Sequence, residues 1–340
     1  MTTFRLATDA DDALLRAMLR ENTMATWVEM TIEREPSFFA GKNIAGEEWA
    51  VIAEDKGGVV GMYTASVLPV HVDGRPERLG YLGGLRVNAG YRRRIRHLRE
   101  GYASIRPLAP VKRSLPWWFT VVAAENATAI RLLESGVPGL PAYLPQGEYV
   151  TFGIPTSRGK RHGLWRRAED VEGLVKFHNT QAARFQCSPV LSEELVRRIG
   201  IEHFFVYEDQ GVAALWDQRA FKQIVARRYR YPAAMPFYNL YAKWFRRIPL
   251  PPEHGALDQT FVAFLALSDA ALADADRLLQ DLLSHCTTPA ASLGLHANHP
   301  LVRIIAKFKP IPYPARVYAV SFDGTPPPNG RPSQPEAALL

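Results

Sequence analysis

Leu79–Arg106 reads LGYLGGLRVNAGYRRRIRHLREGYASIR and organises the rest of the chain. Its first part is apolar and carries Gly83-Gly84, a pattern typical of a β-strand whose backbone another molecule can approach closely. Asn88-Ala89-Gly90 breaks the strand. Apolar residues then recur at helical spacing: Ile95, Leu98, Tyr102 and Ile105. The stretch predicts a strand, a turn and a helix.

The turn between this strand and this helix is strongly basic. It carries Arg92, Arg93, Arg94 and Arg96. Free N–H groups at a helix start attract anions, and arginine can bond two phosphate oxygens at once. The turn is therefore either an anion site or a solvated basic loop on a surface helix, and this stretch alone leaves both interpretations open.

A second strand and helix follow. Phe119–Ala124 is apolar and predicts a buried strand, and Asn126 is a good N-cap for the helix after it. Ala129, Ile130 and Leu133 form one helical face, and Gly136 ends the helix.

This order of elements resembles the acyl-CoA core of the GNAT (GCN5-related N-acetyltransferase) superfamily. The resemblance lies in Leu85-Arg86-Val87, in Tyr91-Arg92, and in Asn126-x-x-Ala129-x-x-Leu132 with Gly136 behind. It implies that the first strand splays from its neighbour and binds the pantetheine arm, and that the turn cradles the pyrophosphate. The cofactor-binding residues it implies are Leu85, Arg86, Val87, Arg92, Arg93, Arg94, Ile95, Arg96, His97, Asn126, Ala129 and Leu133.

Three departures from the family pattern concern cofactor binding and catalysis. Ile95 and His97 stand at two positions where the family turn has small residues, and Leu133 stands where the family often has a general-acid tyrosine. The family's catalytic carboxylate has no match on the central strand. Tyr81 on that strand and Glu125 beside Asn126 are the candidate catalytic groups, although Glu125 can equally serve only to place negative charge at the helix start.

Composition narrows the class of protein. The length of 340 residues suggests two domains. The net charge of +7 is spread over several clusters and not along one stripe, so the charge does not require a nucleic-acid partner. The only cysteines, Cys187 and Cys286, favour a reducing cytoplasm. We see no membrane span, no signal peptide and no metal-binding motif in the sequence.

The second half of the sequence repeats the first. Three segment pairs match in the same order: 6–13 with 167–174, 51–58 with 205–212, and 123–133 with 295–305. We therefore predict an α/β fold of two tandem GNAT-like domains, each a mostly antiparallel twisted sheet flanked by helices. The expected boundaries are an acyl-CoA-binding domain at 1–155, a linker at 156–163, a second domain at 164–323 and a disordered tail at 324–340.

The second domain is expected to be degenerate for CoA. Its central strand, Thr260–Leu267, leads into Ser268-Asp269 with no arginine behind it. A carboxylate at that position opposes phosphate binding.

An unusual segment, Arg227–Pro252, alternates aromatic residues with six cations. Such a segment can bind single-stranded nucleic acid or a membrane surface. The favoured interpretation is that it packs against the domain interface with its basic tips in water.

Together these features predict an N-acyltransferase that uses acetyl-CoA or another acyl-CoA and modifies a small-molecule or peptide amine, without a metal. Two alternatives stay open. One is an acyl-CoA-binding regulatory module without turnover, and the other is a nucleic-acid or membrane-surface adaptor built on Arg227–Arg247.

Overall fold

The computed structural model describes residues 2–21, 24–25, 28–91, 95–110, 115, 117–327 and 330–340. In the first half, the strands and helices are β1 (Thr3–Leu6), α1 (Asp12–Glu21), β2 (Met24–Ala25), β3 (Val28–Glu33), β4 (Glu47–Asp55), β5 (Gly58–Val72), β6 (Arg75–Val87), α2 (Ile95–Leu108), β7 (Trp118–Ala123), α3 (Ala127–Glu134) and β8 (Ala142–Pro155). In the second half, they are β9 (Arg166–Arg167), α4 (Val171–Ala182), α5 (Glu193–Ile199), β10 (Phe204–Tyr207), β11 (Gly211–Trp216), β12 (Gln223–Tyr229), α6 (Met235–Trp244), β13 (Gln259–Leu267), α7 (Ala275–Ser284), β14 (Ala290–His296), α8 (Leu301–Ala306) and β15 (Ile311–Ser321).

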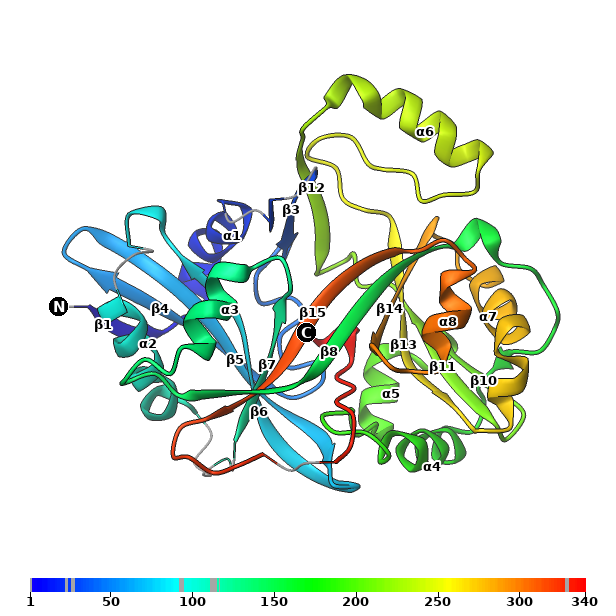
Figure 1. Cartoon of the computed structure of the whole chain (residues 1–340), viewed down its shortest axis with the longest axis horizontal. Helices are drawn as coiled ribbons and strands as arrows, with labels where there is room; N and C mark the ends of the chain where they lie inside the picture. Colours follow the sequence, from blue (N-terminus) through cyan, green and yellow to red (C-terminus); the bar gives the residue numbers. More distant parts are fainter. Residues whose placement is uncertain are drawn as a thin grey trace.

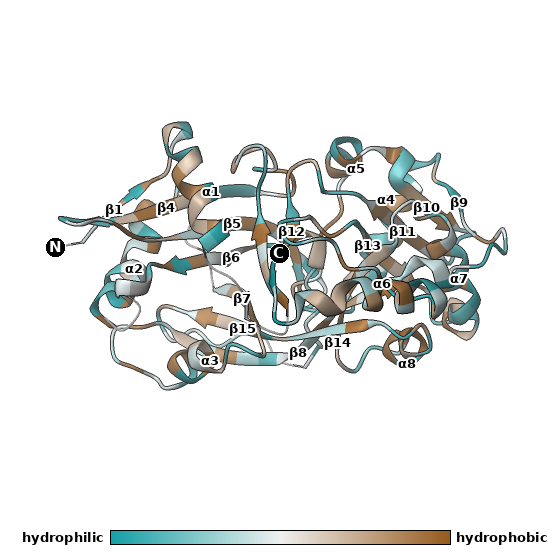
Figure 2. Cartoon of the chain, turned by 90° about the horizontal axis from the view of Figure 1, so that it is seen from above, coloured by the Kyte–Doolittle hydropathy of each residue, from teal (hydrophilic) through white to brown (hydrophobic). Residues whose placement is uncertain are grey.

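One large sheet runs through the whole molecule (Figure 1). Within the described part of the chain its strand order is β1-β4-β5-β6-β7-β15-β8-β14-β13-β11-β10-β9. Helices cover both faces, with α1 and α5 on one side and α3 and α8 on the other in Figure 2. Neighbouring strands are antiparallel except for β6 with β7 and β13 with β14. The predicted fold class, α/β with a mostly antiparallel sheet flanked by helices, is confirmed.

The two halves have the same topology. β1-β4-β5-β6-β7 in the first half corresponds to β9-β10-β11-β13-β14 in the second. In each half the fourth and fifth of these strands are the parallel pair, and a helix connects them: α2 in the first half and α7 in the second. The predicted repeat is therefore visible in the order and pairing of the strands.

The halves exchange a strand at the centre of the sheet. β15, from the end of the second half, lies between β7 and β8, and β8 in turn pairs with β14. Val317 and Tyr318 of β15 are fully buried there. The predicted boundaries at 155 and 164 divide the sequence, and whether each part folds as a unit stays a prediction.

The end of the chain is ordered, so the predicted disordered tail over 324–340 is wrong for residues 330–340. Ala337 and Ala338 are buried. The Gln334 amide donates to the Gly294 carbonyl at 2.8 Å, and the Tyr149 hydroxyl donates to the Pro335 carbonyl at 2.8 Å. The polar composition suggested disorder, but these polar side chains find partners inside the sheet region and the last residues are apolar.

The expectation that Arg227–Pro252 packs against the domain interface holds for the two ends of the segment and not for the outward side of its helix. At its start, β12 pairs with β3 in a separate three-stranded sheet, β12-β3-β2, and near its end the Arg247 guanidinium donates to the Lys309 carbonyl beside β15 at 2.8 Å. Between these ends, helix α6 projects from the molecule (Figure 1), and Phe237 and Trp244 are each 76% exposed. The alternation of aromatic and basic residues does not reveal that the buried side of α6 is covered by the segment that follows it.

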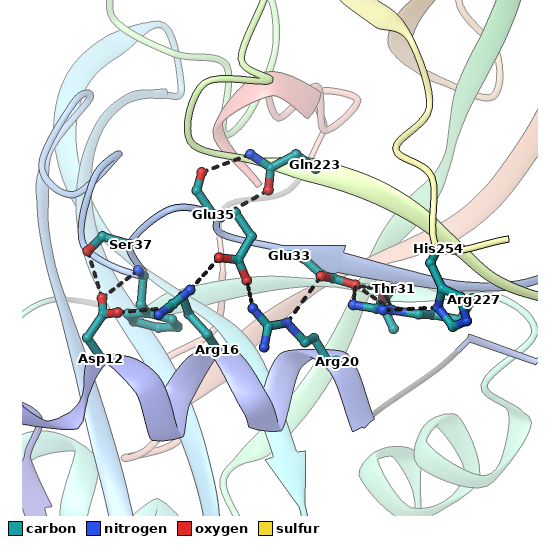
Figure 3. Close-up of polar contacts among 11 residues, drawn as sticks. Asp12, Arg16, Arg20, Thr31, Glu33, Glu35, Ser37, Gln223, Arg227 and His254 are labelled. Atoms are coloured by element: carbon teal, nitrogen blue, oxygen red, sulfur yellow. Dashed lines mark hydrogen bonds and ion pairs between the residues drawn. The ribbon is translucent and has the colours of Figure 1, made fainter. Parts of the chain in front are cut away.

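A polar network fastens this small sheet to α1 (Figure 3). Glu33 of β3 accepts hydrogen bonds from Arg227 of β12, and its Oε2 lies 3.6 Å from Nε of Arg20 on α1. One residue pair joins the halves reciprocally: the Glu35 N–H donates to the Gln223 side chain at 3.0 Å, and the Gln223 amide donates to the Glu35 carbonyl at 2.9 Å.

The exchanged strand predicts that the two halves unfold together. Val317→Ala removes buried methyl groups between β7 and β8 and should lower the free energy of unfolding by about 2 kcal/mol. Scanning calorimetry should show one transition at a lower temperature. Two transitions, only one of them shifted, would contradict this prediction.

Candidate functional site

β6 and β7 separate soon after they meet. They pair only at Gly80 with Trp118 and at Tyr81 with Phe119, and the Thr120 hydroxyl then donates to the Leu82 carbonyl at 2.7 Å. Both strands are fully described and continue to Val87 and Ala123 without further pairing to each other. We call the space beyond Leu82 the first gap. On this side of β6, residues 83–86 pair with no described strand, and backbone polar groups in such a position need a partner of another kind.

A bulge in β6 accompanies the separation. The register between β5 and β6 shifts beside Gly83-Gly84, and Gly84 has φ of +60°. A Cβ added at Gly84 would lie 2.7 Å from the Thr64 hydroxyl oxygen, so only glycine fits comfortably. The glycine pair singled out in the sequence therefore shapes this edge of the gap.

Arg86 is a cation without a carboxylate partner among the described residues. Burial lowers its pKa, its Nη1 donates to the Leu85 carbonyl at 3.0 Å, and its buried Nε has no partner in the described part of the chain. It interacts electrostatically with Tyr81 and with Tyr313. A guanidinium with unused donors is a ready site for an anionic or carbonyl group.

Tyr81, the first candidate catalytic residue, begins the gap. Its ring centroid lies 5.1 Å from that of Phe119, and burial raises its pKa. The phenol therefore stays protonated at neutral pH, which suits a proton donor and not a base.

Glu125, the second candidate, lies exposed in the turn between β7 and α3. The pKa of Tyr313 on β15 is raised mainly by burial, and the negative charge of Glu125 raises it further. The structure thus brings Tyr81, Arg86 and Glu125 toward one region through Tyr313. Sequence reasoning missed Tyr313, because it reaches this place only through the strand exchange and carries no local signal.

The predicted phosphate turn is described only in part. Arg92, Arg93 and Arg94 lie outside the described residues. The Arg96 guanidinium pairs with Glu100 at 2.8 Å, one turn further along α2. Ile95 opens α2 and is half-buried.

His97 and the neighbouring strand residues take different places. His97 Nδ1 lies 2.8 Å from the Thr2 hydroxyl, and its ring packs 5.3 Å from that of Tyr91, which ties α2 to the start of the chain. Leu85 is 49% exposed at the end of β6, next to the half-buried Val87.

Asn126 caps α3. Its Oδ1 accepts from the Ala129 N–H at 3.1 Å, and the side chain is exposed. Ala129 is half-buried, and Leu133 packs against the core that contains Trp118. The capping role is present in the structure, and contact with a CoA arm stays a prediction.

The second half contains an equivalent gap, and the end of the chain fills it. β13 and β14 pair in parallel at only three positions, and β13 has a bulge at Phe264, where φ is +52°. The Glu336 carboxylate accepts from the Phe264 N–H at 2.8 Å. Gln334 bonds the Gly294 carbonyl at 2.8 Å and the His296 N–H at 2.7 Å. The tail therefore satisfies backbone groups on both strands of the second gap.

Two titratable residues accompany the tail. Burial raises the pKa of Glu336 to about 7 and lowers the pKa of Lys222 to about 8. The Lys222 ammonium donates to the Leu340 carbonyl oxygen.

Among the described residues no three His, Cys, Asp or Glu side chains gather into a possible metal site. None of the helices in the same residues is long and apolar enough to cross a membrane.

Comparison with known proteins identifies the fold. No protein-family model matches the chain, and no curated protein matches it in sequence. It is similar in structure to N-myristoyltransferase of Saccharomyces cerevisiae, solved with bound myristoyl-CoA and inhibitors (TM-score 0.59, 9% identity, 94% of this chain and 80% of that one).

Two acetyltransferase structures are also similar. One is a putative acetyltransferase from Pyrococcus horikoshii (TM-score 0.54, 10% identity, 95% and 90% coverage). The other is a GCN5-related N-acetyltransferase from Sphaerobacter thermophilus (TM-score 0.53, 12% identity, 98% and 97% coverage). The chain therefore has the GCN5-related N-acetyltransferase fold in a two-domain form, as the sequence predicts.

The raised pKa of Glu336 gives a pH-dependent stability. Its usual value is 4.5, so the folded protein holds an extra proton between that value and about 7, and stability due to this group falls as pH rises through this window. Glu336→Gln removes the ionisation. Relative to wild type, the variant should gain up to about 3 kcal/mol between pH 4.5 and pH 8, measured by denaturant unfolding. A difference between the two proteins that does not change with pH would contradict this.

Proposed function

We propose that the chain is an acyl-CoA-dependent N-acyltransferase whose cofactor binds in the first gap. The observation that carries the proposal is the contrast between the gaps. The tail supplies hydrogen-bond partners in the second gap, whereas in the first gap no described strand pairs with residues 83–86 of β6, and Arg86 there has no carboxylate partner among the described residues. An extended amide-bearing arm such as pantetheine satisfies strand backbone in the same way that an added strand does.

The same groups suggest the chemistry. The amine nitrogen attacks the thioester carbonyl carbon, the carbon–sulfur bond breaks, and the amine loses a proton. Strand N–H groups facing the gap would stabilise the negative charge that develops on the carbonyl oxygen. We assign Tyr81 as the donor of a proton to the departing thiolate, because its phenol is protonated at neutral pH and it stands where β6 and β7 separate. Glu125 is the candidate acceptor of the amine proton, directly or through water.

Arg86 would bind a carbonyl or phosphate oxygen of the cofactor, because no carboxylate among the described residues neutralises its guanidinium and its Nε has no hydrogen-bond partner there. The co-substrate is acetyl-CoA or a longer acyl-CoA, and the acceptor is a small-molecule or peptide amine.

Two measurements on the full chain test the proposal. Titration calorimetry with acetyl-CoA should show saturable binding, and a thiol-release assay over a panel of amines should show amine-dependent CoA release. Binding without release from any amine would favour the alternative of an acyl-CoA-binding module without turnover. No binding of acetyl-CoA or of longer acyl-CoA would reject both.

Arg86 provides the first prediction for this site. Arg86→Gln removes a charge that has no carboxylate partner in the described chain, so acetyl-CoA binding should weaken by about 1.5–3 kcal/mol. The matched control is Arg316→Gln, which removes an arginine that is partly exposed and paired with Glu134 at 3.2 Å. Equal affinities for both variants and wild type would place the cofactor elsewhere.

Asn126 provides the second prediction for this site. Asn126→Asp keeps the helix cap, because Asp caps as well as Asn, but it loses the amide donor and repels an anionic cofactor. We expect near-wild-type melting with clearly weaker acetyl-CoA binding. A variant that melts lower and binds acetyl-CoA normally would show that Asn126 is only a cap.

A further inference from the structure

Helix α6 turns its apolar side chains outward, toward solvent. Its four outward side chains, Phe237, Leu240, Tyr241 and Trp244, follow the spacing of one helical face and are 76%, 58%, 42% and 76% exposed. Phe245 and Tyr231, just beyond the two ends, are 56% and 63% exposed. We call these six residues the α6 face. A contiguous apolar surface of this kind on one exposed helix marks a binding site.

The other side of α6 is occupied by its own return segment. The Asn239 amide and the Leu250 backbone exchange hydrogen bonds at 3.0 and 2.9 Å, and the Tyr238 hydroxyl donates to the Ile248 carbonyl at 3.2 Å. Ala242 is buried beneath the helix. The orientation of α6 is therefore fixed, and its outward apolar face is not an accident of a loosely attached helix.

The segment that carries the α6 face is rich in cations, and the nearest acid in the sequence, Glu253, follows it and accepts from the Tyr229 N–H at 3.0 Å. Between Arg227 and Pro252 there are six cations and no Asp or Glu. Arg228, Arg230, Lys243 and Arg246 are exposed. At the end of α6, Arg158 donates to the Phe245 and Arg246 carbonyls at 2.9 and 3.2 Å, and the nearby Arg247 and Arg246 add to the effect of burial in lowering the pKa of Arg158.

A pocket lies beside this cationic end. Its volume is about 200 Å³, and its lining includes Tyr241, Arg247, Lys309 and Ile311. It combines an aromatic ring and two cations with apolar surface, which suits an anionic headgroup attached to a hydrocarbon chain.

From these observations we propose that the α6 face binds the surface of an anionic lipid bilayer, with the helix lying in the interface plane. Aromatic and leucine side chains on one face with cations around them are what an interfacial helix needs, and Trp and Tyr favour the headgroup level. The shape also favours a flat partner, because α6 projects from the molecule (Figure 1), whereas single-stranded nucleic acid binds along grooves.

The test is vesicle co-sedimentation of the full chain. The probes are vesicles of phosphatidylcholine alone and of phosphatidylcholine with phosphatidylglycerol in a two-to-one ratio, at low and high salt. We expect the protein to bind the anionic vesicles, and to bind the neutral vesicles about tenfold more weakly. High salt should weaken binding to the anionic vesicles.

Two double variants separate the apolar and the charged contributions. Phe237→Ala with Trp244→Ala should weaken vesicle binding about tenfold or more, because two aromatic side chains no longer enter the interface. Lys243→Glu with Arg246→Glu should weaken binding to the anionic vesicles about tenfold or more. The matched charge control is Arg277→Glu with Arg303→Glu, two exposed residues on α7 and α8 that should leave binding close to wild type.

Circular dichroism and melting curves should match wild type for all variants, since the changed side chains are exposed. Vesicle binding that both α6 variants leave unchanged would overturn the proposal. So would tight binding of a single-stranded oligonucleotide without vesicle binding, or an α6-dependent dimer in sedimentation with no vesicle binding.

Discussion

The exchange of β8 and β15 is the constraint on which the rest of the structure depends. Each strand pairs with the other and with a strand of the opposite half, so the sheet has no seam at which the halves could separate. Backbone hydrogen bonding makes this obligatory, because removing β15 would leave buried edges on both β7 and β8. The exchange also delivers Tyr313 to the first gap and leads the chain back to the second half, where its end enters the second gap.

The two halves of the sheet contain equivalent gaps whose contents differ. In both halves a parallel pair starts, a bulge bends the inner strand, and the ladder stops. The second gap is filled by Gln334 and Glu336, which bond β14 and β13 as a ligand would. Filling one gap from within removes the need for an external partner there. Gly294 lies beside the tail, where an added side chain would collide first with the Tyr149 hydroxyl and then with Ala337.

The sequence predicts local structure well and long-range placement poorly. Asn126 and Gly136 have roles set by their neighbours in the sequence, so the helix cap and the helix end are found where these residue types suggest, whereas the bulge at Gly83-Gly84 is known only from the structure. Tyr313 and the tail have no such signal, because their positions follow from the strand exchange. The segment Arg227–Pro252 shows a third limit. Its pattern indicates an amphipathic element, but only the structure shows which side of that element is covered.

The attachment of the α6 arm, residues 223–252 with β12 and α6, has a geometric consequence. Glu33 is almost fully buried, with only 4% of its side chain exposed, and it is held between Arg227 at the base of the arm and Arg20 of α1 (Figure 3). A buried carboxylate is costly unless both cations stay in place, so the network specifies position more than it adds stability. The Glu35–Gln223 pair adds a second fixed point close by. The arm is thus fastened to the half that contains the first gap, and a surface that bound the α6 face would hold that gap at a defined orientation.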